Sequence, residues 1–332
     1  MSVEIIAEGE INHNGDVGLA KKIISAAAAS GADTVKFQCF VAECFNAPGA
    51  TNRELFKACE LNIEEFRQLR DHAAKEEISM ISTAADLEGL RMIIDLDLPV
   101  IKVGSTNITH TSLLKAIAAT GKPVYLSTGA STTEEIRDAL NLLESNGAGE
   151  VTLFHCTVAY PAPDETLNLR SLSTMIRDFP NHRIGYSDHS LGGVAATVAV
   201  ALGASVIEKH FTTDKTLPGP DHGFSADPEE FSDYIRIIRR AEAMMGSADK
   251  KPTAGEAAGP RLRGRRYLTA FTDIAVGQKI TAPMIRPRRI DATNVDATKI
   301  LEPKWEEKII GARALRDIPD GNALTLEDFD YS

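Results

Sequence analysis

The chain has 332 residues, of which 43% are hydrophobic and 25% are charged, and these proportions exclude disordered, collagen-like and disulfide-scaffold proteins. Lys and Arg number 36 against 47 Asp and Glu, and the resulting net charge of −11 disfavours binding to nucleic acid or to an anionic membrane. The length suits one large α/β barrel followed by a small appended module.

Eight short apolar or β-branched runs recur along the first 211 residues and predict strands. They are residues 3–8, 34–38, 78–83, 100–105, 123–129, 151–156, 183–190 and 205–211. Stretches with the apolar spacing of helices lie between them, as in residues 18–30 and 131–144. Eight such units within about 250 residues predict an α/β fold of the (β/α)₈ TIM-barrel type. The absence of a GxGxxG loop argues against a doubly wound sheet.

The character of the sequence changes after Gly246. Residues 248–264 are rich in Lys, Pro, Gly and Ala without apolar periodicity, which predicts a linker and ends the barrel domain at residues 1–247. Residues 265–332 hold 11 basic and 11 acidic residues, and the linker holds four basic and two acidic residues, so the barrel carries the remaining net charge of −13. Their short apolar runs, with turns at Gly277 and Gly321, predict a compact mixed module that docks on another surface because it is marginally stable alone.

Two further classes of protein are disfavoured by what the sequence lacks. No uncharged apolar stretch of 18 residues is present, so we expect no membrane segment and a cytoplasmic location. The four cysteines form no CxxC pair, which disfavours structural zinc and a redox motif, and we expect reduced thiols. These cysteines are Cys39, Cys44, Cys59 and Cys156.

Polar residues end most of the predicted strands, and in a barrel of this kind the active site forms at the carboxyl ends of the strands. These residues are Glu8, Lys36, Gln38, Ser82, Thr83, Lys102, Ser105, Ser127, Thr128, Ser187, Asp188, His189, Glu208 and His210. Alternation along a strand places Lys36 and Gln38 on one face, and Glu208 and His210 likewise share a face. The sequence therefore predicts a polar site at one end of the barrel.

His189 and His210 end neighbouring predicted strands, which lie about 4.8 Å apart in a sheet. Two imidazoles at this distance can bind one divalent cation and leave positions open for water and a substrate oxygen. The alternative is that each is a hydrogen-bonded structural histidine at the barrel mouth. Asp188 either orients a metal ligand by accepting its hydrogen bond or caps the loop.

Lys36 and Lys102, with Ser105, Ser127 and Ser187, predict a cationic, hydroxyl-lined pocket for a phosphate or carboxylate. Such a pocket requires a local field opposite in sign to the net charge of the barrel. The alternative is that the lysines are solvated surface charges.

The remaining polar candidates have less specific interpretations. Glu8 is a candidate general acid or base, or an acceptor for a sugar hydroxyl, and the alternative is a cap on the following turn. His13 and His155 are interpreted as structural residues. Cys156 is interpreted as a packing residue because the sequence shows no dedicated base beside it.

These residues lie within segments that together resemble the sialic acid synthase family, whose members condense phosphoenolpyruvate with an aldose to make nonulosonic acids. The segments are AE at 7–8, NHNG at 12–15, GAD at 31–33, VKFQ at 35–38, IKVGS at 101–105, GKPVYLSTGAST at 121–132, FHCTVAYPAP at 154–163, GYSDHS at 185–190, EKHF at 208–211 and PGPDH at 218–222. They span the whole barrel, and the ordered SDH, EKHF and PGPD set is highly specific. The resemblance implies a (β/α)₈ barrel followed by an antifreeze-like (SAF) domain.

The resemblance also implies roles for individual residues. His189 and His210 would be the metal ligands, with manganese the usual ion and magnesium or cobalt as alternatives. The phosphoenolpyruvate pocket would comprise Lys36, Thr83, Lys102, Ser105, Ser127 and Ser187. The residues facing the sugar or its aldehyde would be Glu8, Gln38, Tyr160 and Asp221. Members form domain-swapped homodimers in which one subunit's tail caps the other's barrel and supplies an arginine, here Arg289 or, as the alternative, Arg288.

Four departures from the family pattern concern the sugar side or the mouth of the site. Asn107 stands where a carboxylate is usual, and Val158 replaces the Asn of the CTNxYP string. The tail reads RPRRIDATN at 286–294 instead of RPGxG, and the third strand ends STAAD at 82–86 instead of STPFD. The acceptor therefore stays open among N-acetylmannosamine, a diacetamido-trideoxyhexose, an unacylated aldose and a phosphorylated sugar.

The function expected from the sequence is a metal-dependent condensation of phosphoenolpyruvate with an open-chain aldose, giving a nonulosonic acid and phosphate. Its catalytic residues would be Glu8, His189 and His210. Two alternatives are a metal-dependent pyruvate aldolase, which would release no phosphate, and a non-catalytic sugar-binding homologue.

Overall fold

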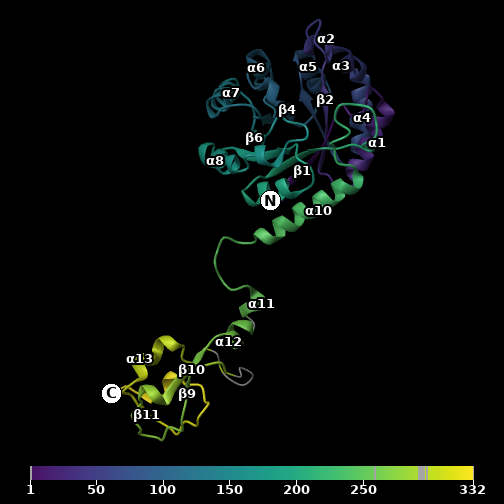
Figure 1. Cartoon of the computed structure of the whole chain (residues 1–332). Coiled ribbons are helices and arrows are strands. Elements are labelled where there is room, and N and C mark those ends of the chain that lie inside the picture. The colour runs from purple at the N-terminus through teal and green to yellow at the C-terminus, as the bar shows by residue number, and fades with distance from the viewer. Residues whose placement is uncertain (1, 258, 291–295, 297, 332) are drawn as a thin grey trace. The chain divides into compact units, whose positions relative to one another are not determined.

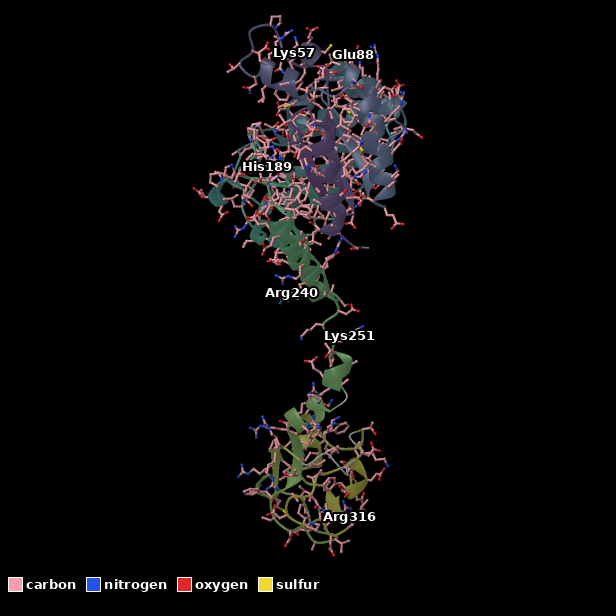
Figure 2. All side chains as sticks on the ribbon, turned by 90° about the vertical axis from the view of Figure 1, so that its right-hand side faces the viewer. Lys57, Glu88, His189, Arg240, Lys251 and Arg316 are labelled. Carbon is pink, nitrogen blue, oxygen red and sulfur yellow. The ribbon has the colours of Figure 1, made fainter. Side chains whose placement is uncertain are left out.

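The computed structural model of the chain describes residues 2–257, 259–290, 296 and 298–331. The chain divides into two compact units, Met1–Gly246 and Ser247–Ser332 (Figure 1). His189 belongs to the first unit and Arg316 to the second (Figure 2). No helix in the described part of the chain is long and apolar enough to cross a membrane.

The first unit is a closed barrel of eight parallel strands that pair in sequence order, with the eighth strand pairing with the first. The strands are β1 (Glu4–Glu10), β2 (Thr34–Cys39), β3 (Ser79–Ala84), β4 (Ile101–Val103), β5 (Val124–Ser127), β6 (Val151–Cys156), β7 (Arg183–Asp188) and β8 (Val206–His210). The predicted TIM barrel is confirmed. Strand β4 is shorter than predicted because the 3₁₀ helix η1 (Ser105–Asn107) follows it almost at once.

Helices follow the strands and surround the barrel (Figure 1). They are α1 (Val17–Ala29), α2 (Ala42–Phe45), α3 (Arg53–Cys59), α4 (Ile63–Lys75), α5 (Leu87–Asp95), α6 (Thr111–Ala118), α7 (Thr133–Ser145), α8 (Arg170–Asp178), α9 (Val194–Ala201) and α10 (Pro228–Met245), with the 3₁₀ helix η2 (Asp164–Thr166) before α8. Three begin with a capping box, in which the N-cap side chain and a glutamate three residues later satisfy each other's backbone N–H groups. The N-cap residues are Asn62, Thr132 and Asp227.

Apolar side chains plug the interior of the barrel below the predicted site. The plug consists of Ile6, Ile81, Tyr125, Phe154 and Val206, all buried. On each of these strands, the residue two positions after the plug residue faces the same side of the strand. The strands that supply the plug therefore also supply the layer above it. That upper layer is polar.

The second unit has its own apolar core and two small antiparallel sheets. One sheet pairs β9 (Tyr267–Ala270) with β10 (Ile285–Arg288), and the other pairs β11 (Arg313–Ala314) with β12 (Phe329–Asp330). Its remaining elements are α11 (Ala254–Ala257), α12 (Pro260–Gly264), η3 (Ala282–Met284), η4 (Pro303–Trp305), α13 (Glu306–Ile309) and η5 (Leu326–Asp328). Helices α11 and α12 lie inside the predicted linker, and four or five residues are too few to show apolar periodicity in a sequence. Assignment of the unit as an SAF domain stays a prediction.

Candidate active site

A cavity of about 320 Å³ lies at the carboxyl ends of the barrel strands. It brings together the residues predicted for the metal, donor and sugar sites, namely Glu8, Lys36, Gln38, Thr83, Lys102, Ser105, Ser127, Tyr160, Ser187, His189, His210 and Asp221. Glu208 also lines it, whereas the predicted strand-end residues Ser82, Thr128 and Asp188 do not. Most of these side chains are buried, whereas Tyr160 is 51% exposed at the mouth. Arg289 belongs to the second unit, where it is exposed.

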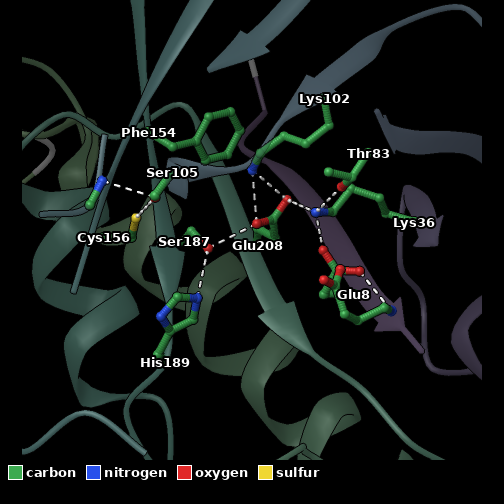
Figure 3. Close-up of polar contacts among 12 residues, drawn as sticks. Glu8, Lys36, Thr83, Lys102, Ser105, Phe154, Cys156, Ser187, His189 and Glu208 are labelled. Atoms are coloured by element: carbon green, nitrogen blue, oxygen red, sulfur yellow. Dashed lines mark hydrogen bonds and ion pairs between the residues drawn. The ribbon is translucent and has the colours of Figure 1, made fainter. Parts of the chain in front are cut away.

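Glu208 pairs with both lysines of the cavity (Figure 3). Its two carboxylate oxygens each accept a 2.9 Å hydrogen bond from Lys102 Nζ, and Oε2 lies 3.2 Å from Lys36 Nζ. Lys36 also forms an ion pair with Glu8, and Ser187 Oγ donates a 2.8 Å hydrogen bond to Glu208. The prediction of a cationic pocket is therefore corrected, because buried carboxylates already compensate the lysine charges.

The two carboxyl groups of this ion-pair network differ in their affinity for protons. Burial raises the pKa of Glu8 well above its usual value, and the opposing effect of Lys36 does not cancel that rise. Burial acts in the same direction on Glu208, but Lys102 and Lys36 together hold the pKa of Glu208 below its usual value. Glu208 thus stays ionised as a fixed partner of the lysines, and Glu8 is the group suited to exchanging a proton.

His189 and His210 lie side by side at the ends of β7 and β8, with ring centroids 5.5 Å apart. His189 Nδ1 is 2.6 Å from the carbonyl oxygen of Thr157, and since a carbonyl only accepts, this nitrogen carries the proton. His189 Nε2 is then the unprotonated nitrogen, 3.3 Å from Ser187 Oγ. Burial lowers the pKa of both imidazoles, and in His210 the neighbouring His189 and Lys36 lower it further. Both rings are therefore neutral near pH 7.

A divalent cation fits this pair of imidazoles. His210 Nδ1 is buried and has no hydrogen-bond partner among the described residues, and a neutral imidazole is the form that binds metals. Nowhere in residues 2–257, 259–290, 296 and 298–331 do three or more His, Cys, Asp or Glu side chains form a group that could hold a metal ion. Protein ligands at this site would thus be the two imidazoles, with the other positions left to water or substrate.

Two aromatic rings and the carboxyl group of Asp221 lie against the imidazoles. The ring centroid of Tyr160 lies 4.3 Å from that of His189, and Phe224 lies 4.9 Å from His210. Asp221 Oδ2 lies 3.9 Å from His210 Nδ1, and burial together with Glu8 raises the pKa of Asp221 to about 6. Sequence reasoning missed Phe224, since an isolated Phe carries no site signal.

Hydroxyl groups also line the cavity. Lys36 Nζ donates a 3.1 Å hydrogen bond to Thr83 Oγ1, and Ser105 Oγ accepts a 3.0 Å hydrogen bond from the backbone N–H of Gly129. A Cβ atom at Gly129 would lie 2.6 Å from Val158 Cγ2, 2.8 Å from Cys156 Sγ and 2.9 Å from Ser105 Oγ, so a larger residue at this position would displace all three side chains. Cys156 Sγ lies 3.2 Å from the same hydroxyl, at the cavity wall.

Glu10 is a cavity residue that sequence reasoning missed. The pairing of β1 with β2 shifts register between Glu8 and Glu10, and Glu10 has a left-handed backbone with φ of +39°. This bulge aims the Glu10 N–H at Glu8 Oε1, 2.7 Å away, and leaves the Glu10 carboxyl group at the cavity wall. Gly9, directly after the predicted strand over residues 3–8, was the available signal for a bulge.

An apolar wall on one side of the cavity was also missed. It comprises Ile11 after β1, Phe45 at the end of α2, and Leu55 and Phe56 in α3. Phe45 and Phe56 pack edge to face with ring centroids 4.9 Å apart. The two short helices that carry these residues were not predicted, because they interrupt the regular strand–helix alternation.

The structure changes the interpretation of two departures from the family pattern. Asn107 faces away from the cavity, and its Nδ2 donates hydrogen bonds to the carbonyl oxygens of Ala84 and Ala85 at 3.3 and 2.9 Å. Asn107 therefore contacts the STAAD segment, and Thr106 lines the cavity instead. Val158 lines the cavity, whereas residues 291–294 of the RPRRIDATN string lie outside the described residues.

Comparison with known proteins identifies consistent relatives. A sequence model described as the NeuB family matches residues 23–250. N,N'-diacetyllegionaminic acid synthase of Legionella pneumophila is 36% identical, covering 98% of this chain and 94% of its own, and the Campylobacter jejuni enzyme of the same name is 40% identical, covering 82% and 86%. A crystal structure of N-acetylneuraminic acid (sialic acid) synthetase from Leptospira borgpetersenii in complex with citrate superposes with a TM-score of 0.75 at 33% identity, covering 80% of this chain and 92% of that one.

Proposed function

The chain belongs to the NeuB family, and from this membership and the cavity geometry we propose that it condenses phosphoenolpyruvate with an open-chain aldose to give a nonulosonic acid and phosphate. The observation that carries this proposal is one cavity holding two neutral imidazoles beside two buried lysines. C3 of phosphoenolpyruvate attacks the aldehyde carbon, water adds at C2, and phosphate departs with cleavage of its bond to C2.

Lys36 and Lys102 bind the phosphate and carboxylate groups of the donor. Because Lys36 is already paired with Glu8, a bound trianion competes with Glu8 for the ammonium group. The raised pKa of Glu8 allows its carboxyl group to take up a proton as the donor binds, which frees Lys36 for the donor. Glu208 keeps its charge and holds Lys102 in position, so the two carboxylates have different tasks.

His189 and His210 would hold a divalent cation, with manganese proposed and magnesium or cobalt as alternatives, which would supply Lewis-acid polarisation of the aldehyde oxygen. Charge balance supports this assignment. Four carboxyl groups and two lysines line the cavity, so a dication offsets the excess of negative charge that arises when all four carboxyl groups are ionised. Tyr160 and Phe224 limit water access to the imidazoles.

The acceptor is proposed to be N-acetylmannosamine or a related acylated aldose. The names of the Legionella and Campylobacter relatives favour a diacetamido sugar for this chain, and the apolar wall offers surface for acyl or deoxy groups. Gln38, Glu8, Tyr160 and Asp221 would face the sugar hydroxyls or its aldehyde. Thr106 lines the cavity, whereas Asn107 is bonded to a backbone carbonyl away from it. Recognition of the sugar would therefore not involve the side chain of residue 107.

Assembly and location belong to the same proposal. A domain-swapped homodimer would allow the second unit of one subunit to supply Arg289 to the acceptor bound by the other. The expected location is the cytoplasm.

The test is inorganic phosphate release from phosphoenolpyruvate with a panel of aldoses, with and without a chelator. We expect metal-dependent release that is lost in His210→Ala and kept in the control His182→Ala, which changes a histidine bonded to the carbonyl of Val151 at the other end of the barrel. Undiminished release after chelation would contradict the metal role. Aldol addition of pyruvate without phosphate release would favour the aldolase alternative, and absence of any product would favour a sugar-binding protein.

A further inference from the structure

A buried ion pair lies directly behind the two cavity histidines. Asp188 and Lys209 immediately precede His189 and His210 in the sequence, and Lys209 Nζ lies 3.2 Å from Asp188 Oδ2. Because neighbouring residues of a strand face opposite sides, this pair lies on the outer face of the barrel wall. Both side chains are at most 5% exposed, and neither lines the cavity.

The ion pair is connected to the chain on both sides of His189. Lys209 Nζ donates a 2.6 Å hydrogen bond to the carbonyl oxygen of Ser190, and Asp188 Oδ1 accepts from the N–H and hydroxyl of Ser190 at 2.9 and 2.6 Å. Lys209 on β8 therefore holds the residue before and the residue after His189. No hydrogen bond joins Asp188 to the His189 ring, so Asp188 is a loop cap rather than an orienting acceptor for that ring.

Helix α10 completes the arrangement. Tyr234 donates a 2.9 Å hydrogen bond from its hydroxyl to Asp188 Oδ2, the oxygen that also faces Lys209. Lys209 Nζ lies 5.1 Å from the centroid of the Tyr234 ring, and Tyr234 is buried. The Tyr186 hydroxyl is 3.3 Å from the other oxygen of Asp188.

We propose that Asp188, Ser190, Lys209 and Tyr234 form a clamp that sets the separation of His189 and His210, so that metal affinity depends on a tyrosine that touches neither imidazole. Tyr234 is then a positioning residue. This inference rests on the proposed function, because it assumes that these histidines hold the metal. A well-packed apolar cluster stabilises a fold as well as a buried ion pair does, so the polar clamp is better explained by the geometry it imposes.

The chain offers a matched control. Tyr125 is also buried, and its hydroxyl donates a 2.6 Å hydrogen bond to Glu4 Oε2 at the opposite end of the barrel. Tyr125→Phe and Tyr234→Phe therefore remove the same chemical group from the same kind of contact. Only Tyr234→Phe removes it next to the histidines.

The experiment measures Mn²⁺ binding to the metal-free full chain by electron paramagnetic resonance of the free ion, alongside urea unfolding of each variant. We expect Tyr234→Phe to raise the Kd about threefold to tenfold, below the roughly 10- to 100-fold cost of changing a group that contacts a metal ligand. Tyr125→Phe should lower stability without changing the Kd. Tyr186→Phe removes the longer hydrogen bond to Asp188 and should raise the Kd by a smaller factor. This variant replaces Tyr234→Phe in the test if Tyr234→Phe does not fold.

The outcomes separate the clamp from the proposed function. Mn²⁺ binding by the unaltered chain with an unchanged Kd in Tyr234→Phe would overturn the clamp alone. Equal weakening in Tyr125→Phe would also overturn it, since the effect would then follow global stability. Absence of Mn²⁺ binding in the unaltered chain would overturn the metal assignment and the clamp with it.

Discussion

The barrel interior has two layers that differ by a step of two residues along the same strands. Ile6, Ile81 and Val206 belong to the apolar plug, and Glu8, Thr83 and Glu208 follow them in the polar layer. The plug stabilises the fold by excluding water, whereas the polar layer places buried charges where they are costly unless paired. The residues that stabilise the fold and the residues that line the site therefore lie two positions apart on the same strands, and not in separate segments of the chain.

Lys102 tests this separation most strongly, because it belongs to the polar layer but reaches the plug. Its Nζ pairs with Glu208 and lies 4.2 Å from the centroid of the Phe154 ring. Lys102→Met would leave Glu208 with one of its two lysine partners, and we expect the free energy of unfolding to fall by about 3–5 kcal/mol. Loss of a donor-binding charge should also lower phosphate release at least about 100-fold. Urea unfolding and phosphate assays measure the two effects.

The matched control lies in the plug. Ile6→Ala removes a fully buried side chain and should cost about 2–5 kcal/mol of unfolding free energy, a loss comparable to that of Lys102→Met. If the two layers are functionally separate, phosphate release per folded molecule should change little in Ile6→Ala. Equal losses of activity in both variants would show that the layers do not act independently.

Strand periodicity also explains how much of the site was predictable. The faces of Glu8, Lys36 and His210 follow from alternation along single strands, and all three line the cavity. Alternation does not tell which side chains meet across the barrel, so the pairing of Glu208 with both lysines could not be predicted. The barrel itself was predictable because eight strand–helix units repeat.

Local backbone geometry explains the remaining differences. The predicted strand ended at Glu8, whereas β1 continues through a bulge to Glu10, whose carboxyl group also lines the cavity. The 3₁₀ helix after β4 aims Asn107 at the carbonyl groups of Ala84 and Ala85, away from the cavity. Both features depend on backbone angles that apolar periodicity does not encode.

His13 sharpens the comparison, because it is a buried titratable group near the polar layer with a structural role. Its Nδ1 accepts a hydrogen bond from the backbone N–H of Gly15, and burial lowers the pKa of His13 to about 4. The unfolded chain binds a proton on this histidine at about pH 6.5, so between pH 6.5 and 4 the unfolded state holds more protons. Its contribution to stability is therefore lost as the pH falls through this range and is constant above it.

His13→Asn should remove this part of the pH dependence. The substitution keeps a hydrogen-bond acceptor but has no group that titrates in this range. Between pH 7.5 and pH 5 the unaltered protein should lose about 2 kcal/mol more unfolding free energy than the variant loses. Urea unfolding at both pH values measures it, and parallel pH curves would contradict the assignment.

The smallest expected effect concerns Glu10, whose left-handed backbone is strained for a residue with a Cβ atom. Glu77 has a similar backbone, with φ of +55°, but is exposed outside the cavity. Glycine at either position relieves the strain, so Glu10→Gly and Glu77→Gly should each raise the free energy of unfolding by roughly 0.5–1 kcal/mol. Only Glu10→Gly removes a carboxyl group from the polar layer, and it should raise the KM for the acceptor severalfold. A gain in stability without a change in KM would place Glu10 among the structural residues, and the polar layer would then end at Glu8.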